Sequence, residues 1–186
     1  TMARERRTDP PAAPVAALCH DGETLLGAWP LAELPRLAAS LFVPPAADER
    51  VGWQARFSQV QPVGSPPQLW LELEAHAHVT LQCQRCLKAL QEPLAMQRRF
   101  RFVASEAEAE RLDAESDDDH LVLEPRLDLR ALVEDELILE LPLVPRHEGD
   151  CPEPLPLAAP DADEPEARPN PFAALAALRK PGGGGA

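Results

Sequence analysis

A regular alternation of apolar and polar side chains over residues 69–82 constrains the fold of this chain more than any other feature. An apolar residue stands at every second position from Leu69 to Leu81, and mostly polar residues stand between them. Successive side chains of a strand point to opposite faces of a sheet, so this period of two predicts a long strand with one buried and one solvated face. Residues 89–103 follow after a short turn and are predicted to return as its antiparallel partner.

Shorter strands and helices are predicted on either side of this hairpin. A proline is tolerated in the first turn of a helix but breaks its interior, and aspartate is a favourable N-cap. Apolar spacing and these signals predict the following elements: strands over residues 21–28, 50–61 and 120–124, and helices from about Pro35 to Pro44 and from Asp128 to Pro142. Consecutive strands with short connections favour antiparallel pairing. We therefore predict an α+β fold, an antiparallel sheet that can curl into a partial barrel, flanked by short helices.

The 22 prolines gather near both ends of the chain and indicate the domain boundaries. Residues 1–18 mix Pro, Ala and Arg and predict a mobile arm. Residues 152–169 are acidic and Pro-rich, which predicts a disordered linker. Between them, residues 19–151 are predicted to form one domain, and residues 170–186 a short amphipathic helix with a glycine tail.

The charge balance excludes two classes of function. The chain has 18 Lys and Arg against 31 Asp and Glu, a net charge of −13. Holding nucleic acid by bulk charge needs clustered cations, and so does adsorption to anionic lipid, so we predict neither a DNA nor a membrane partner. No apolar run approaches the roughly 20 residues of a membrane-spanning helix, and no apolar signal region is evident. We expect a cytoplasmic protein, in which cysteines favour metal binding or free thiols over disulfides.

Two pairs of potential metal ligands stand far apart in the sequence. Cys83 and Cys86 form a C-x2-C turn, here called the knuckle (residues 83–86), and His147 and Cys151 form an H-x3-C pair. Zinc binds four such ligands in a tetrahedron, and each pair can supply two. Unmetallated thiols in a packed corner are an equally open interpretation. A redox-active C-x2-C would open a helix after a strand, which the antiparallel flanks disfavour.

Two further histidine-containing pairs are weaker candidates. Cys19 and His20 could add ligands, but an ordinary thiol beside a mobile arm is the favoured interpretation. His76 and His78 project from the same face of the long strand, where a metal pair is conceivable. A solvated sheet face that also carries glutamates is the favoured interpretation there.

Basic residues near the knuckle and on the return strand are candidates for contact with RNA. If residues 79–88 pair with residues 93–103, these charges share one end of the sheet, with Phe100 and Phe102 nearby to stack on bases. Ordinary surface arginine is an equally good interpretation. The candidate set is Arg85, Lys88, Arg98, Arg99 and Arg101.

The C-terminal segment 170–180 is a candidate docking peptide. Phe172, Leu175 and Leu178 share one face of the predicted helix, and an acidic linker tethers it. Amphipathic helices of this kind dock in apolar grooves of partners. The alternative is that the segment packs back on its own domain.

No motif in the sequence points to an enzyme. A glycine-rich phosphate loop, G-x-S-x-G and H-E-x-x-H are all missing from it. Glu134, Asp135 and Glu136 are consecutive in a predicted helix, so they point in different directions and form no catalytic pair. We predict no catalytic residues.

Three motifs together resemble a known family. They are V-T-L-Q-C-Q-R-C-L at residues 79–87; the helix after Asp128 that runs into L-P-L-V-P-R-H at residues 141–147 and then Cys151; and N-P-F-A at residues 170–173. In this combination the chain resembles the bacterial YceD family, the large ribosomal RNA subunit accumulation proteins. The resemblance implies a non-enzymatic role in the synthesis, processing or stability of 23S ribosomal RNA. It implies as partner the large-subunit RNA or a precursor particle. The acidic charge of the chain adds a basic ribosomal protein as a candidate partner.

The resemblance assigns no catalytic role to the motif residues, and it leaves open whether zinc is bound. The other class of function that remains is a metal- or thiol-dependent RNA-processing enzyme, in which the knuckle would be catalytic. The motif positions that carry over are Cys83, Gln84, Arg85, Cys86, Pro142, His147 and Cys151.

Overall fold

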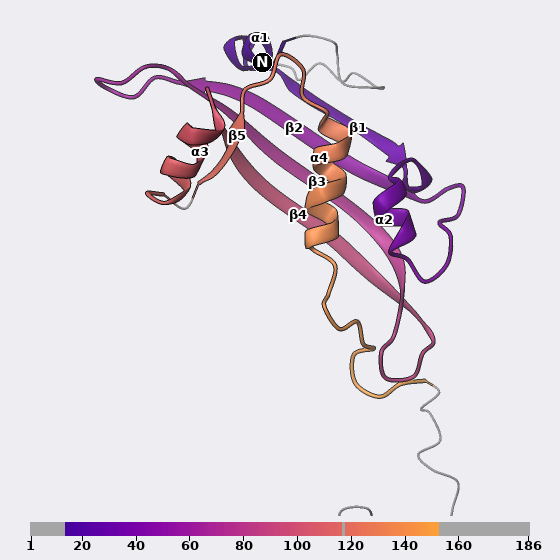
Figure 1. Ribbon diagram of the computed structural model, residues 1–186. Helices are drawn as coiled ribbons and strands as arrows, with labels where there is room; N and C mark the ends of the chain where they lie inside the picture. The colour runs from indigo at the N-terminus through magenta and orange to yellow at the C-terminus, as the bar shows by residue number, and fades with distance from the viewer. Residues whose placement is uncertain (1–13, 117, 153–186) are drawn as a thin grey trace, which may run out of the picture. The chain divides into compact units, whose positions relative to one another are not determined.

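The alternating segment forms the central strand of a five-stranded sheet (Figure 1). The computed structural model describes residues 14–116 and 118–152. Its strands, in spatial order, are β1 (Thr24–Pro30), β2 (Arg50–Val60), β3 (Gln68–Gln82), β4 (Ala89–Val103) and β5 (Asp119–Val122). The predicted strand over residues 89–103 is confirmed residue for residue, and those over 50–61 and 69–82 within one residue at each end.

The pairing of β5 corrects the prediction of an all-antiparallel sheet. The strands β1 to β4 pair antiparallel, but β5 pairs parallel with β4, so the sheet is mixed. Helix α3 (Glu106–Asp113) lies in the connection from β4 to β5, and a crossover of this kind allows parallel pairing. The sheet is not closed into a barrel, because β1 and β5 are its two edges.

Helices α2 (Pro35–Ala39) and α4 (Leu129–Leu139) pack on one face of the sheet (Figure 1). The predicted N-cap is confirmed, since the Asp128 carboxylate accepts a hydrogen bond from the Ala131 amide at 2.9 Å. The helix ends at Leu139, before Pro142. The apolar positions of β3 and β4 pack against the buried side of α4 in one core, to which α4 contributes Leu129, Val133 and Leu137.

A buried glutamate joins α2 to α4. The Glu134 side chain is 6% exposed, and its Oε1 accepts hydrogen bonds from the backbone amides of Arg36 at 2.6 Å and Leu37 at 3.1 Å. Helix α2 has no side-chain N-cap of its own. The carboxylate of Glu134 therefore satisfies amides at the first turn of α2, which otherwise lack partners within the helix.

The predicted mobile arm over residues 1–18 is wrong for residues 15–18, which begin helix α1 (Val15–Asp21). Val15 and Leu18 are buried in the core, so burial of apolar surface orders them. The arm's residues 1–13, the linker from residue 153 on and the predicted helix and tail over residues 170–186 lie outside the described residues. No helix in the described part of the chain has the length and apolar character to cross a bilayer.

Candidate metal centre

The knuckle is the turn between β3 and β4. The Cys83 amide donates to the Lys88 carbonyl at 2.9 Å, and the Leu87 amide donates to the Cys83 carbonyl at 2.8 Å. Leu87 adopts a left-handed conformation, with φ of 61°, which closes the turn. Both cysteines are buried, and the hairpin thus presents two thiols from one short loop.

The loop after α4 packs against the knuckle through backbone contacts (Figure 1). The Gln84 amide donates to the Pro145 carbonyl at 2.8 Å. The Arg85 guanidinium donates to the carbonyls of His147, at 3.3 Å, and Gly149. Gly149 takes φ of 68°, a left-handed conformation that glycine adopts without steric cost, and Cys151 follows two residues later.

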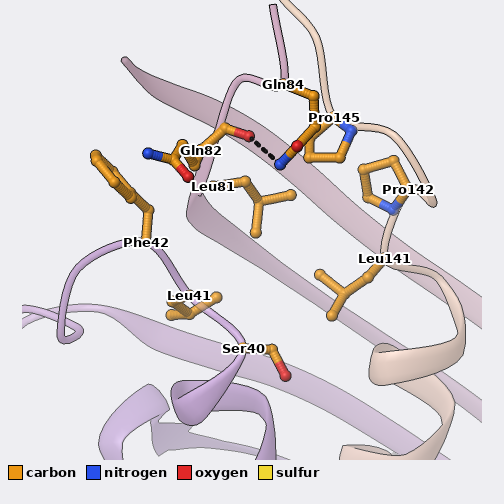
Figure 2. A pocket seen from close by; sticks show the side chains of 9 residues that line it. All are labelled: Ser40, Leu41, Phe42, Leu81, Gln82, Gln84, Leu141, Pro142 and Pro145. Carbon is orange, nitrogen blue, oxygen red and sulfur yellow. Dashed lines mark hydrogen bonds between the residues drawn. The ribbon is translucent and has the colours of Figure 1, made fainter. Parts of the chain in front are cut away.

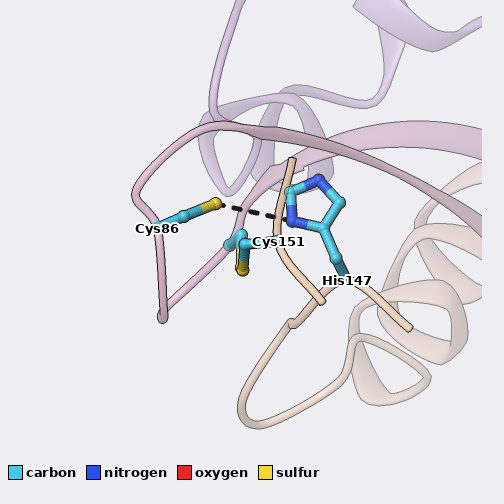
Figure 3. Close-up of side chains that lie close together, drawn as sticks. Cys86, His147 and Cys151 are labelled. Carbon is cyan, nitrogen blue, oxygen red and sulfur yellow. Dashed lines mark hydrogen bonds between the residues drawn. The ribbon is translucent and has the colours of Figure 1, made fainter. Parts of the chain in front are cut away.

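These two loops bring four potential ligands together. The ligand atoms of Cys83, Cys86, His147 and Cys151 all lie within 4.8 Å of one another. The Sγ atoms of Cys83 and Cys151 are 3.8 Å apart. Cys86 Sγ is 3.5 Å from Nδ1 of His147 (Figure 3). The other ring nitrogen of His147, Nε2, lies 3.1 Å from the Ala89 carbonyl oxygen. Donation of Nε2–H to this carbonyl leaves the lone pair of Nδ1 directed at the thiols, as in metal-ligating histidines.

The electrostatics of the cluster favour a negative sulfur at Cys83 and disfavour one at Cys86. Burial of the Cys83 thiol raises its pKa, but hydrogen bonds with nearby backbone groups outweigh this effect and lower the pKa to about 5. Burial raises the pKa of Cys86. Arg85 Nε donates to Cys151 Sγ at 2.9 Å, and this contact is the main cause that raises the Arg85 pKa. Three thiols and one imidazole thus form a group that could hold a metal ion, and the Arg85 cation lies beside it.

The family can now be assigned. A family model described as "Large ribosomal RNA subunit accumulation protein YceD" matches residues 71–179. The chain belongs to the YceD family. The matched region contains the knuckle, α4 and the loop with His147 and Cys151. No solved structure is similar enough to the chain to count as a match.

The pairing register of β3 and β4 in this YceD protein corrects the prediction that the basic residues lie together. Gln82 pairs with Ala89 at the knuckle end of the hairpin, whereas Trp70 pairs with Arg101 near the other end. The arginines at 98–101 therefore lie far along the hairpin from the knuckle, and the prediction that all five candidate cations share one end of the sheet is wrong.

Several of the predicted RNA-binding side chains contact other parts of the protein or are buried, whereas binding of RNA at the knuckle would need them to be accessible there. Arg98 donates to carboxylates of α4, Glu136 at 3.1 Å and Glu140 at 2.9 Å. The predicted stacking residues Phe100 and Phe102 are buried in the core, on the face away from solvent. Arg99 lies over the ring of Trp70 at 4.0 Å. The RNA role of Arg85, Lys88, Arg98, Arg99 and Arg101 stays a prediction.

The other sequence candidates are dispersed. Cys19 is buried in the core, where burial raises its pKa, whereas His20 is exposed, so the two do not form a ligand pair. His76 and His78 are exposed on the sheet. Phe172, Leu175 and Leu178 lie outside the described residues. No sequence signal points to Ala89, because it contributes a backbone carbonyl that any residue would supply.

A pocket of about 350 Å³ adjoins the knuckle (Figure 2). It lies between the end of α2, the end of β3 and the loop after α4. None of its lining residues is ionisable, so the pocket offers no general acid or base. These residues are Ser40, Leu41, Phe42, Leu81, Gln82, Gln84, Leu141, Pro142 and Pro145.

The left-handed turn at Leu87 gives a prediction for the knuckle. A left-handed residue other than glycine costs about 1–2 kcal/mol, and Leu87 is 48% exposed, so its removal sacrifices little burial. Leu87→Gly should leave the protein as stable as before or about 1 kcal/mol more stable, whereas the β-branched Leu87→Val should destabilise it by about 1 kcal/mol. Urea unfolding of the two variants measures this. Equal stability of the Val and Gly variants would contradict the turn geometry.

Proposed function

We propose that this YceD protein is a non-enzymatic factor in the accumulation of 23S ribosomal RNA, acting in the cytoplasm on the large ribosomal subunit or its precursor. The observation that carries the proposal is the family match, whose description names accumulation of the large ribosomal RNA subunit. The four-residue cluster supports a structural role, because it joins two loops distant in sequence and leaves no position for a substrate.

We infer that the metal is zinc. A tetrahedron with Zn–S of about 2.3 Å and Zn–N of about 2.0–2.1 Å has S···S edges of about 3.8 Å and S···N edges of about 3.6 Å. The distances of 3.8 Å between Cys83 and Cys151 and of 3.5 Å between Cys86 and His147 agree with these edges. Sulfur and imidazole ligands suit zinc better than magnesium or calcium. Zinc would fasten the loop after α4 to the β3–β4 hairpin.

The function is exerted by binding ribosomal RNA or a ribosomal protein. A net charge of −13 disfavours non-specific attachment to RNA and suits a basic ribosomal protein. Contact with RNA therefore has to be local, through a surface of particular shape and charge, and weak in the absence of that surface.

The alternative is an RNA-processing enzyme with Cys83 as nucleophile, and its lowered pKa is the observation in its favour. The thiol is, however, fully buried and surrounded by three other ligands. Replacing Cys83 with serine and measuring cleavage of large-subunit precursor RNA separates the two. Cleavage by the wild type that is lost in the variant, with the fold intact, supports the enzyme.

Crosslinking in cells tests the proposed function. The full chain, crosslinked by ultraviolet light and purified under denaturing conditions, should recover 23S ribosomal RNA or its precursor well above an unrelated acidic protein. On sucrose gradients it should sediment in part with large-subunit precursors. If crosslinking recovers no large-subunit RNA and no protein sediments with precursors, the proposed function is rejected.

A further inference from the structure

The face of the sheet opposite α4 carries a compact surface that the metal centre does not use. Strand register places Gly52, His76 and Ala95 side by side on β2, β3 and β4, and His78 beside Pro93 in the next row of that face. Both histidines are exposed, and so are Pro93 and Ala95. We call these five residues the histidine patch.

The absence of a side chain on Gly52 makes room for the His76 ring. A Cβ atom on Gly52 would lie 2.5 Å from both Cε1 and Nε2 of His76, so the imidazole occupies the space above the β2 backbone. Any side chain at position 52 would displace it. Ala95, which pairs with His76 on β4, also has a short side chain. The histidine patch therefore lets one imidazole lie against the sheet while leaving it open to solvent.

The positions of the two histidines on β3 suit successive nucleotides. His76 and His78 are two residues apart on one strand, so their Cα atoms are about 6.7 Å apart and their side chains share one face. Sheet-based RNA-binding modules stack two or three unpaired bases on aromatic side chains, histidine included, that project from an open sheet face. Such stacking tolerates any base, because every base has a π-face.

The charge that strands β1 to β4 contribute to this face also differs from that of the whole chain. Strands β1 to β4 contribute six charged residues to this face, namely Arg50, Arg56, Glu72, Glu74, Arg99 and Arg101. The arginines outnumber the glutamates here, although the chain has a net charge of −13. Both glutamates have partners: Glu72 pairs with Arg56 at 3.2 Å, and Glu74 accepts from Gln97 at 3.3 Å.

We propose that this sheet face binds single-stranded RNA, with His76 and His78 stacking on two successive bases. Arg99 and Arg101 lie two and three rows further along the face, opposite Glu72 and Trp70, and would face phosphates of the nucleotides that follow. The proposal rests on the proposed function and names its contact surface. It places the RNA contact on the sheet and leaves the metal centre a structural role. It also accounts for glycine at position 52, because a side chain there would disturb the stacking surface.

Fluorescence anisotropy of the full chain with a fluorescein-labelled RNA of about 12 mixed-sequence nucleotides tests this. His76→Ala combined with His78→Ala should weaken binding at least about tenfold, in line with the loss of stacked bases. Replacing both histidines with phenylalanine should retain the affinity, since phenylalanine keeps the stacking face and removes the ring nitrogens. Gly52→Val should weaken binding through displacement of the His76 ring.

The matched control is Arg111→Ala, which removes a positive charge from exposed α3 and should leave the affinity unchanged. Urea midpoints equal to that of the wild type verify that the histidine variants fold. Wild-type affinity in the double alanine variant overturns the proposal, and so does loss of binding in the double phenylalanine variant. Binding of a Lys- and Arg-rich peptide in place of the RNA also overturns it, in favour of a protein partner. Recovery of large-subunit RNA by the wild type in cells would keep the proposed function intact in each of these cases.

Discussion

Removal of the metal should lower the melting temperature by about 8–16 °C and release the loop after α4, while the sheet stays folded. A ligand present at about 1,000 times its dissociation constant adds about 4 kcal/mol of stability. For a domain of this size, 1 kcal/mol corresponds to about 2–4 °C. The effect is local because the core of the sheet and α4 does not include the cluster, whereas the contacts of residues 147–151 are mainly with the knuckle.

Metal analysis of the natively purified protein should give one zinc per chain. A chelator strong enough to remove it should then increase hydrogen exchange and proteolysis within residues 143–151 before the sheet strands respond. Cys83→Ser should reproduce both effects. Cys19→Ser is the matched control: it also removes a buried thiol, but one outside the cluster, so the zinc content should stay at one. Purified protein without metal, and a melting temperature insensitive to chelator, would exclude a zinc ion that joins the loop after α4 to the hairpin.

Glu134→Ala should destabilise the protein by about 3 kcal/mol. The substitution removes the acceptor for the amides of Arg36 and Leu37, and Leu37 is fully buried. Each unsatisfied buried amide costs about 1–3 kcal/mol. The side-chain pair with Arg36 adds little to this figure, because that guanidinium is half exposed.

Urea unfolding measures the effect as a change in midpoint at constant slope. Glu134→Gln keeps a neutral acceptor and should cost less than the alanine variant. Asp135→Ala is the control, since Asp135 pairs with the same arginine but is 52% exposed, and it should cost less than about 1 kcal/mol. A Glu134→Ala variant as stable as Asp135→Ala would mean that the carboxylate does not cap α2.

The long hairpin could be predicted from the sequence because its information is local. Alternation over residues 69–82 fixes which side chains of β3 are buried, whatever surrounds the strand. The cap at Asp128 and the proline at position 35 are also local signals, and helices begin beside both residues. The parallel pairing of β5 could not be read in this way, since a strand of four residues carries no signal for its direction.

The candidate site likewise has features that the sequence could predict and features that depend on the tertiary structure. The chemistry of four ligands in two pairs was evident from residue types and spacing, and the structure brings all four together. The predicted position of the arginines at 98–101 beside the knuckle is wrong, because it depends on the length of the hairpin and on the pairing of its far end. Arg98 meets Glu136 and Glu140 only through the packing of α4 on the sheet.

The sequence by itself therefore determined the strand pattern, the main helix and the types of ligand. Each of these follows from residues that stand close together within one continuous segment. Only the tertiary structure decided that Cys151 lies beside Cys83, that Glu134 caps α2 and that His76 rests on Gly52. Such contacts join side chains from separate elements. Their geometry follows from how those elements pack on one another, and no single segment of the sequence specifies that packing.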